Sequence, residues 1–121
     1  MNEMSATKQR IIQELVPGKQ VTLAHIIASP DEILYVKLGL DPQTSLTRSA
    51  IGVLTVSPAE TAIIMADIAL KAADVELGFV DRLSGSLIIT GSVSSVEASV
   101  NAILSYVEEK LGYTTVPVTR T

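Results

Sequence analysis

The sequence predicts an α+β sandwich in which helices cover one main, mainly antiparallel sheet. Three observations predict this class. Short runs of branched apolar residues alternate with helix-like segments, three of these segments carry a Ser-x-x-Glu helix-start signal, and Gly- or Pro-containing turns separate the runs. The predicted order of elements is β-β-α-β-α-β-β-α-β.

The chain opens with two predicted strands. Residues 1–10 are polar, residues 11–16 form a short apolar strand, and Pro17-Gly18 is a strong turn signal that closes it. Residues 20–28 follow, and they are rich in branched residues and apolar on both faces. This pattern favours a central strand covered on both sides.

Three helices are predicted from their capping signals. In Ser29-Pro30-Asp31-Glu32, the Ser oxygen can accept from a free backbone amide while the Glu reaches back to the cap. This short helix is expected to end at Gly39, because glycine adopts positive φ without steric cost. Ser57-Pro58-Ala59-Glu60 repeats the signal before a longer helix that runs to about Ala73, and Ser94 with Glu97 predicts the third.

The two longer helices show amphipathic spacing. Asp67 and Lys71 lie four residues apart on the predicted polar face of the first, and its apolar face comprises Ile64, Met65, Ile68 and Ala72. In the last helix, apolar residues keep helical spacing until Gly112, at Val93, Val96, Val100, Ile103, Leu104, Val107 and Leu111.

Further strands are expected between and after these helices. They span residues 50–56, 74–82, 87–91 and 113–118. The turn Ser84-Gly85-Ser86 joins two of them as a hairpin, and residues 41–49 are expected to form an exposed loop.

Composition limits the possible function classes. With 121 residues the chain is one domain, and its net charge of −4, without a basic run, argues against a nucleic-acid partner. No apolar stretch approaches the roughly 20 residues of a membrane helix, and no signal peptide is evident, which predicts a cytosolic protein. Cysteine is absent, and mean hydropathy is high at +0.40. The apolar surplus indicates either a subunit interface or a compact aliphatic core.

Candidate chemistry is sparse, and we expect no enzyme, cofactor or metal. His25 is the only histidine; it is placed on a strand face with Val21, Leu23 and Ile27, which favours a structural role over a ligand role. Asp81-Arg82 is read as a solvated strand end rather than a catalytic pair. No phosphate-binding glycine motif occurs, and the capping role accounts for the serine candidates.

Two stretches resemble a known family. Residues 50–91, with Leu70-Lys71-Ala72-Ala73 and Gly91-Ser92-Val93, resemble the bacterial microcompartment (BMC) shell domain. Residues 13–27 resemble the opening of its circularly permuted branch, which includes ethanolamine- and propanediol-utilisation shell proteins. In that branch the segment that closes an ordinary shell domain stands at the front, as residues 25–30 do here. The similarity covers about residues 10–112.

The resemblance implies a ferredoxin-like, circularly permuted shell domain with a structural function. Residues 1–18 would be an N-terminal tail and extra strand, and residues 19–121 the shell domain. Such proteins form flat or bent homohexamers that tile, with other shell proteins, into a layer around encapsulated enzymes in the bacterial cytoplasm. That layer retains an aldehyde intermediate. No membrane partner is implied.

The resemblance also implies roles for particular residues. Lys71 matches the lysine at the tile edge, where neighbouring hexamers meet. The turn around the six-fold axis corresponds to Arg82, Leu83, Ser84, Gly85 and Ser86. The N-terminal strand, six copies of which can form a small barrel that plugs the axis, corresponds to Ile11, Ile12, Gln13, Glu14, Leu15 and Val16. Ser29 replaces an edge arginine common in ordinary shell domains.

Two other functions stay open from the residues alone. An oligomeric, ligand-sensing regulatory α+β domain would share the same alternation of strands and helices. A small oligomeric enzyme would have to use His25 and Asp81, which is the weaker alternative.

Overall fold

The computed structural model describes residues 18–40 and 49–121. The predicted strand at residues 11–16, and residues 41–48 of the predicted loop, lie outside the described residues. The described elements are β1 (Gln20–Ile27), α2 (Glu32–Leu38), β2 (Ala50–Ser57), α3 (Thr61–Ala72), β3 (Val75–Asp81), β4 (Ser86–Gly91), α4 (Val93–Glu109) and β5 (Thr119–Arg120).

The strands form one five-stranded sheet in the order β3-β4-β2-β1-β5. All neighbouring pairs are antiparallel except β1 and β5, which are parallel. The predicted α+β class with a mainly antiparallel sheet is therefore confirmed, and the predicted bounds of β2, β3 and β4 hold to within one residue.

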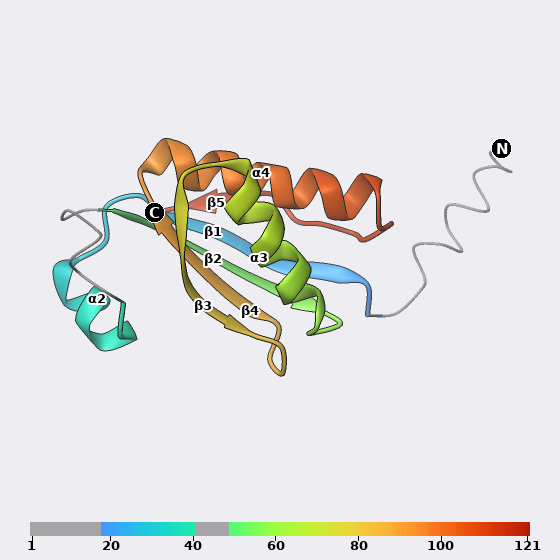
Figure 1. Ribbon diagram of the computed structural model, residues 1–121, viewed down its shortest axis with the longest axis horizontal. Helices are drawn as coiled ribbons and strands as arrows, with labels where there is room; N and C mark the ends of the chain where they lie inside the picture. Colours follow the sequence, from blue (N-terminus) through green and yellow to red (C-terminus); the bar gives the residue numbers. More distant parts are fainter. Residues whose placement is uncertain (1–17, 41–48) are drawn as a thin grey trace, which may run out of the picture.

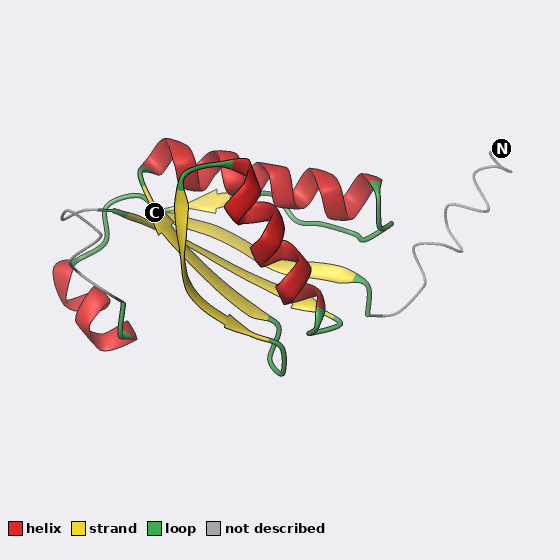
Figure 2. Ribbon diagram, viewed as in Figure 1, coloured by secondary structure: helices red, strands yellow, loops and turns green. Residues whose placement is uncertain are grey.

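One layer of two helices covers one face of the sheet, and a short third helix lies at one end (Figures 1 and 2). α3 and α4 lie on one face, where buried apolar residues from both helices and four strands form the main core, including Leu54, Met65, Ile89 and Ile103. α2 lies at one end of the opposite face, where Tyr35 and Leu40 pack on Ile51 in a smaller cluster. Much of the opposite face has no helix over it among the described residues.

A bulge in β1 changes which residues share a face. The pairing with β2 shifts register between Val21 and Leu23, so Val21 joins Ala24 in the main core. His25 instead alternates with the buried Ala24 and Ile26 and points to the opposite face. The prediction that His25 shares a face with Val21 is therefore wrong, because the bulge interrupts the two-residue period.

The predicted helix caps are also displaced. α2 is capped by Asp31, whose carboxylate accepts from the Ile33 amide at 3.0 Å, and not by Ser29. Asp caps a helix as well as Ser does, so the helix starts two residues later than predicted. Its end at Gly39, with φ of 73°, is as predicted.

The other two caps differ for separate reasons. Ser57 pairs with Gln20 as the last residue of β2, so α3 begins only at Thr61 and has no side-chain cap. α4 is capped by Ser92, whose Oγ accepts from the Ser95 amide at 3.1 Å, and not by Ser94. Ser92 and Ser94 are two residues apart and either serine can cap a helix, so the sequence pattern does not choose between them.

The predicted strand at residues 113–118 is wrong in extent. Thr114 forms a single bridge to Gln20, and regular pairing begins only at Thr119. Pro117 interrupts the segment and has no amide hydrogen to donate to a strand neighbour. The C-terminal segment therefore follows the outer edge of β1 and joins the sheet only in the short strand β5.

Candidate functional site

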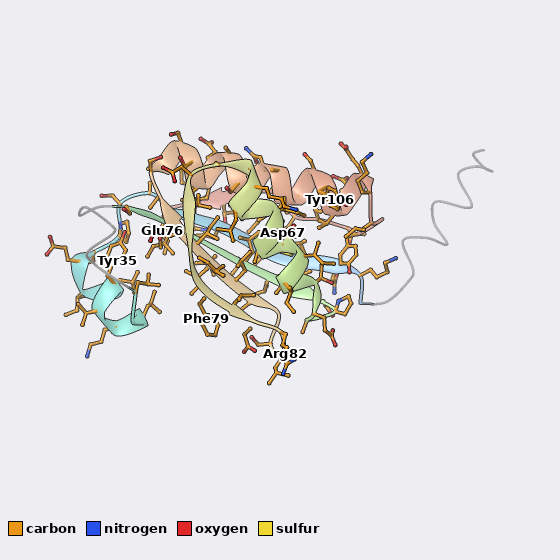
Figure 3. The ribbon with its side chains drawn as sticks, viewed as in Figure 1. Tyr35, Asp67, Glu76, Phe79, Arg82 and Tyr106 are labelled. Atoms are coloured by element: carbon orange, nitrogen blue, oxygen red, sulfur yellow. The ribbon has the colours of Figure 1, made fainter. Side chains whose placement is uncertain are left out.

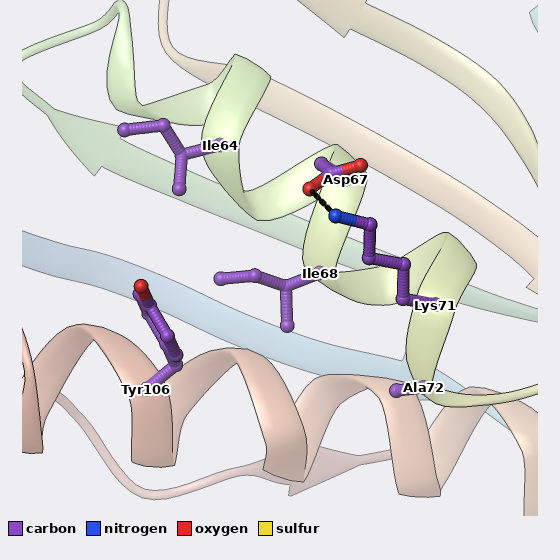
Figure 4. A pocket seen from close by; sticks show the side chains of 6 residues that line it. All are labelled: Ile64, Asp67, Ile68, Lys71, Ala72 and Tyr106. Atoms are coloured by element: carbon purple, nitrogen blue, oxygen red, sulfur yellow. Dashed lines mark ion pairs between the residues drawn. The ribbon is translucent and has the colours of Figure 1, made fainter.

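A groove runs between α3 and α4 on the outer surface of the helix layer (Figure 4). It has a volume of about 350 Å³. Five residues of α3 and one of α4 line it: Ile64, Asp67, Ile68, Lys71, Ala72 and Tyr106. The α3 residues recur at helical spacing, so they form one stripe beside the stripe that enters the core.

Exposure within this groove differs from the sequence prediction. Ile64 is 45% exposed and Ala72 is also exposed, although the sequence places both on the apolar face of the helix. The residues of α3 that enter the core are instead mainly small ones, together with Met65. Small side chains bring α3 close to the sheet, so that Ile64 remains at the surface near Tyr106, which is 44% exposed.

An ion pair lies along one wall of the groove. Lys71 Nζ is 2.8 Å from the Asp67 carboxylate, one helical turn away, and both side chains are largely exposed. The hydrogen bond to Asp67, with its negative charge, raises the pKa of Lys71 above its usual value. Lys71 is therefore a charged group, and its predicted pairing with Asp67 is confirmed.

The turn between β3 and β4 is held by Asp81. Its carboxylate accepts from the Leu83 amide at 2.9 Å and from Ser84 Oγ at 2.8 Å. The backbone hydrogen bond from Leu83, with that from the Ser84 hydroxyl, lowers the pKa of Asp81. The ionised carboxylate thus orders a turn whose tip, Leu83, is 83% exposed.

Gly85 anchors this turn to the neighbouring strand. Its φ is 80°, its amide donates to the Asp81 carbonyl at 2.8 Å, and its carbonyl accepts from the Val56 amide at 2.9 Å. A Cβ atom built on Gly85 would lie 2.2 Å from the Val56 carbonyl oxygen. Only glycine fits this close approach of two backbones.

His25 links β1 to the C-terminal segment. Its Nδ1 lies 2.6 Å from Thr119 Oγ1, and its Nε2 lies 2.9 Å from Thr121 Oγ1. Both ring nitrogens are thus engaged by hydroxyl groups, which is a structural role. Asp81 is on β3, three strand spacings or about 14 Å away, which is beyond the reach of a proton-transfer pair.

Within residues 18–40 and 49–121, no three His, Asp or Glu side chains cluster in a way that could hold a metal ion. No described helix combines the length and apolarity required to cross a membrane.

The two described sets of predicted site residues lie apart. Figure 3 shows this separation for Asp67, the ion-pair partner of Lys71, and Arg82 of the β3–β4 turn. Lys71 is in the last turn of α3, shortly before β3 begins, whereas residues 82–86 follow the end of β3. The seven-residue strand separates them by roughly 20 Å. Residues 11–16 lie outside the described residues. Tyr106, which lines the groove, is not among the residues predicted from the sequence. The available signal is its position between the core residues Ile103 and Val107.

Comparisons with known proteins match most of the chain. The model of the BMC domain matches residues 50–119. The microcompartment shell protein CutR of Streptococcus intermedius is 53% identical over 111 residues, which are 92% of this chain and 91% of CutR. The chain belongs to the BMC domain family. PduU of Salmonella typhimurium, also a microcompartment shell protein, is 48% identical over 98% of this chain and 99% of its own length.

Solved structures of BMC domain proteins show the same fold. A structure described as a CutR flat hexamer has a TM-score of 0.80 and 50% identity, and covers 89% of this chain and 95% of that one. A fused permuted hexameric shell protein has a TM-score of 0.63 and 25% identity, over 70% of this chain and 45% of that one. In this chain β1 precedes the matched region and pairs with β2 inside it. This is the arrangement of a circularly permuted BMC domain.

Proposed function

We propose that this chain is a homohexameric tile of a bacterial microcompartment shell in the cytoplasm, and that it acts structurally, without catalysis. The main support is its identity of about 50% to CutR, which has been solved as a flat hexamer. Six-fold rings join unlike surfaces of neighbouring subunits, and closed rings can tile a layer. The tile would retain an aldehyde intermediate with other shell proteins around encapsulated enzymes. Unchanged aldehyde release from cells lacking the chain would contradict that retention.

Within such a tile, we propose that the groove between α3 and α4 lies at the edge of the ring. We propose that the β3–β4 turn lies at the six-fold axis. The separation of roughly 20 Å along β3 supports different positions for Lys71 and residues 82–86. The exposed Leu83 and the turn held by Asp81 suit a loop that meets its copies around an axis. Residues 11–16 are proposed as the strand of a plug over that axis.

Replacing Lys71 tests the edge assignment. Lys71→Ala is expected to leave the hexamer intact, because the side chain is exposed and stabilises little beyond its pair with Asp67. It is expected to abolish sheets of hexamers seen by electron microscopy. Light scattering serves as the control for hexamer mass. Tiling like that of the wild type would show that Lys71 is not at the edge.

Deleting residues 1–16 tests the axial plug. The truncated chain is expected to remain hexameric while the density over the six-fold axis disappears from class averages of single rings. The reason is that the predicted core and ring contacts lie in residues 19–121. A monomeric truncated protein would show that the N-terminal segment belongs to the subunit interface instead.

A further inference from the structure

The two long strands nearest the sides of the sheet protect their outer edges in different ways. β3, at one side, carries the charged residues Glu76 and Asp81 and has a register shift next to Gly78. Charges and bulges of this kind hinder pairing with a strand of another molecule. β1 spans eight residues and contains no Asp, Glu, Lys or Arg. Apart from the bulge near Val21, its own sequence offers no such protection.

The outer edge of β1 is covered instead by residues 113–121, which we call the strap. The strap runs back from the end of α4 along β1 (Figure 1). Backbone hydrogen bonds hold it near its two ends, where Thr114 and Thr121 each form two such bonds of 2.9–3.1 Å with residues at or next to the ends of β1. Within the described strap, residues 115–118 form no hydrogen bond to β1, and Pro117 has no amide hydrogen to donate.

The side-chain contacts at the end of the strap are exposed. Arg120 lies 2.9 Å from the Glu97 carboxylate of α4, and both side chains are about half exposed. His25 holds the hydroxyl groups of Thr119 and Thr121, as described above. Apolar side chains of the strap pack against the main core, but none of its residues is buried. A segment with so little buried surface opens at a lower free energy than the core does.

We propose that the strap is an autoinhibitory element: in place it blocks the outer edge of β1, and when displaced it lets β1 pair antiparallel with β1 of a second copy. The freed amides and carbonyls of an uncharged eight-residue strand are a template for such pairing. A second copy supplies a strand of the same length with no charge to bury. Two identical edges can meet across a two-fold axis, which makes the contact isologous. The inference does not rest on the proposed tile, because it applies to a single chain and to a ring alike.

A release variant loosens the strap without shortening the chain. It combines Thr119→Val and Thr121→Val, which remove both hydroxyl partners of His25, with Arg120→Glu, which sets like charges against each other at Glu97. All three substituted residues are exposed, so the rest of the fold is expected to stay intact. The matched rescue adds Glu97→Arg, which restores an ion pair of reversed polarity.

Hydrogen exchange measures the opening of the strap. The Ala28 amide donates to the strap at 2.9 Å, and it is expected to exchange about tenfold faster in the release variant, because exchange follows the population of the open form. The Ile103 amide in α4 is expected to keep its wild-type rate. Arg120→Glu alone, which is the milder variant, should give about a fivefold increase that Glu97→Arg cancels. An unchanged rate at Ala28 in the release variant would show that these contacts do not hold the strap.

Thiol cross-linking measures the pairing of β1 with β1. The chain has no cysteine, so Leu23→Cys, in the middle of β1 and 39% exposed, supplies the only thiol. Mild oxidation is expected to give disulfide-linked dimers in the release variant and not with the intact strap, because facing residues of an antiparallel pair lie within disulfide reach. Phe79→Cys on β3 is the control, and its yield of linked dimer should be the same with either strap.

A synthetic peptide of residues 113–121 separates edge pairing from general unfolding. Added in excess, the peptide is expected to suppress the linked dimers of the release variant, because it covers the edge of β1 from outside. The same peptide with valine in place of Thr119 and Thr121 should suppress them less, since it lacks the contacts to His25. Fast exchange at Ala28 without linked dimers, or dimers that the peptide does not suppress, would overturn the proposed pairing.

Discussion

Gly85→Ala is expected to destabilise the fold by about 3 kcal/mol. An alanine at φ of 80° costs about 1–2 kcal/mol in the left-handed region, and displacing a crowded neighbour costs a further 1–3 kcal/mol. The neighbour here is backbone, because the new Cβ would lie 2.2 Å from the Val56 carbonyl oxygen. The measurement is the urea midpoint of unfolding at a fixed protein concentration.

Gly39→Ala is the matched control for that experiment. Gly39 also has positive φ, at 73°, but a Cβ there meets no atom within 4 Å. Gly39→Ala is expected to lower the free energy of unfolding only by the conformational cost of positive φ, about 1 kcal/mol. Equal losses of unfolding free energy in Gly85→Ala and Gly39→Ala would show that the β3–β4 turn does not approach β2 as closely as described.

Ile103→Ala is expected to lower the free energy of unfolding by about 2–5 kcal/mol. Ile103 is fully buried on the face of α4 that packs on the sheet, so the truncation removes apolar contacts and leaves a cavity. Ile33→Ala on α2 is the control, because Ile33 is 61% exposed, and its effect should stay within about 0.5 kcal/mol. Denaturant unfolding measures both. A small loss at Ile103 would contradict the described position of α4.

The sequence predicts the sheet and the two large helices because their apolar period is strong. The residues Val96, Val100, Ile103 and Val107 follow the helical spacing and are all buried in the core. Boundaries are less predictable, since Ser92, Ser94 and Ser95 all have capping side chains and only the backbone path selects one. The bulge near Val21 has no signal in the local pattern.

Tertiary packing decides what the sequence leaves open at the candidate site. Ile64 and Ala72 fit an apolar helix face, yet they remain exposed because Met65 and its small neighbours already fill the contact with the sheet. The pairing of Asp67 with Lys71 depends on local spacing alone and was predictable. The place of Lys71 in an assembly depends on other copies of the chain, and it stays a prediction.

The native mass of the purified protein tests the central proposal most directly. Light scattering coupled to size exclusion should give six copies of the 12.8 kDa chain, or larger sheets that return to six copies in the Lys71→Ala variant. A mass of six copies would support the proposed tile, and its edge and axis would then be the surfaces to test. A stable monomer or dimer at micromolar concentration would contradict the tile.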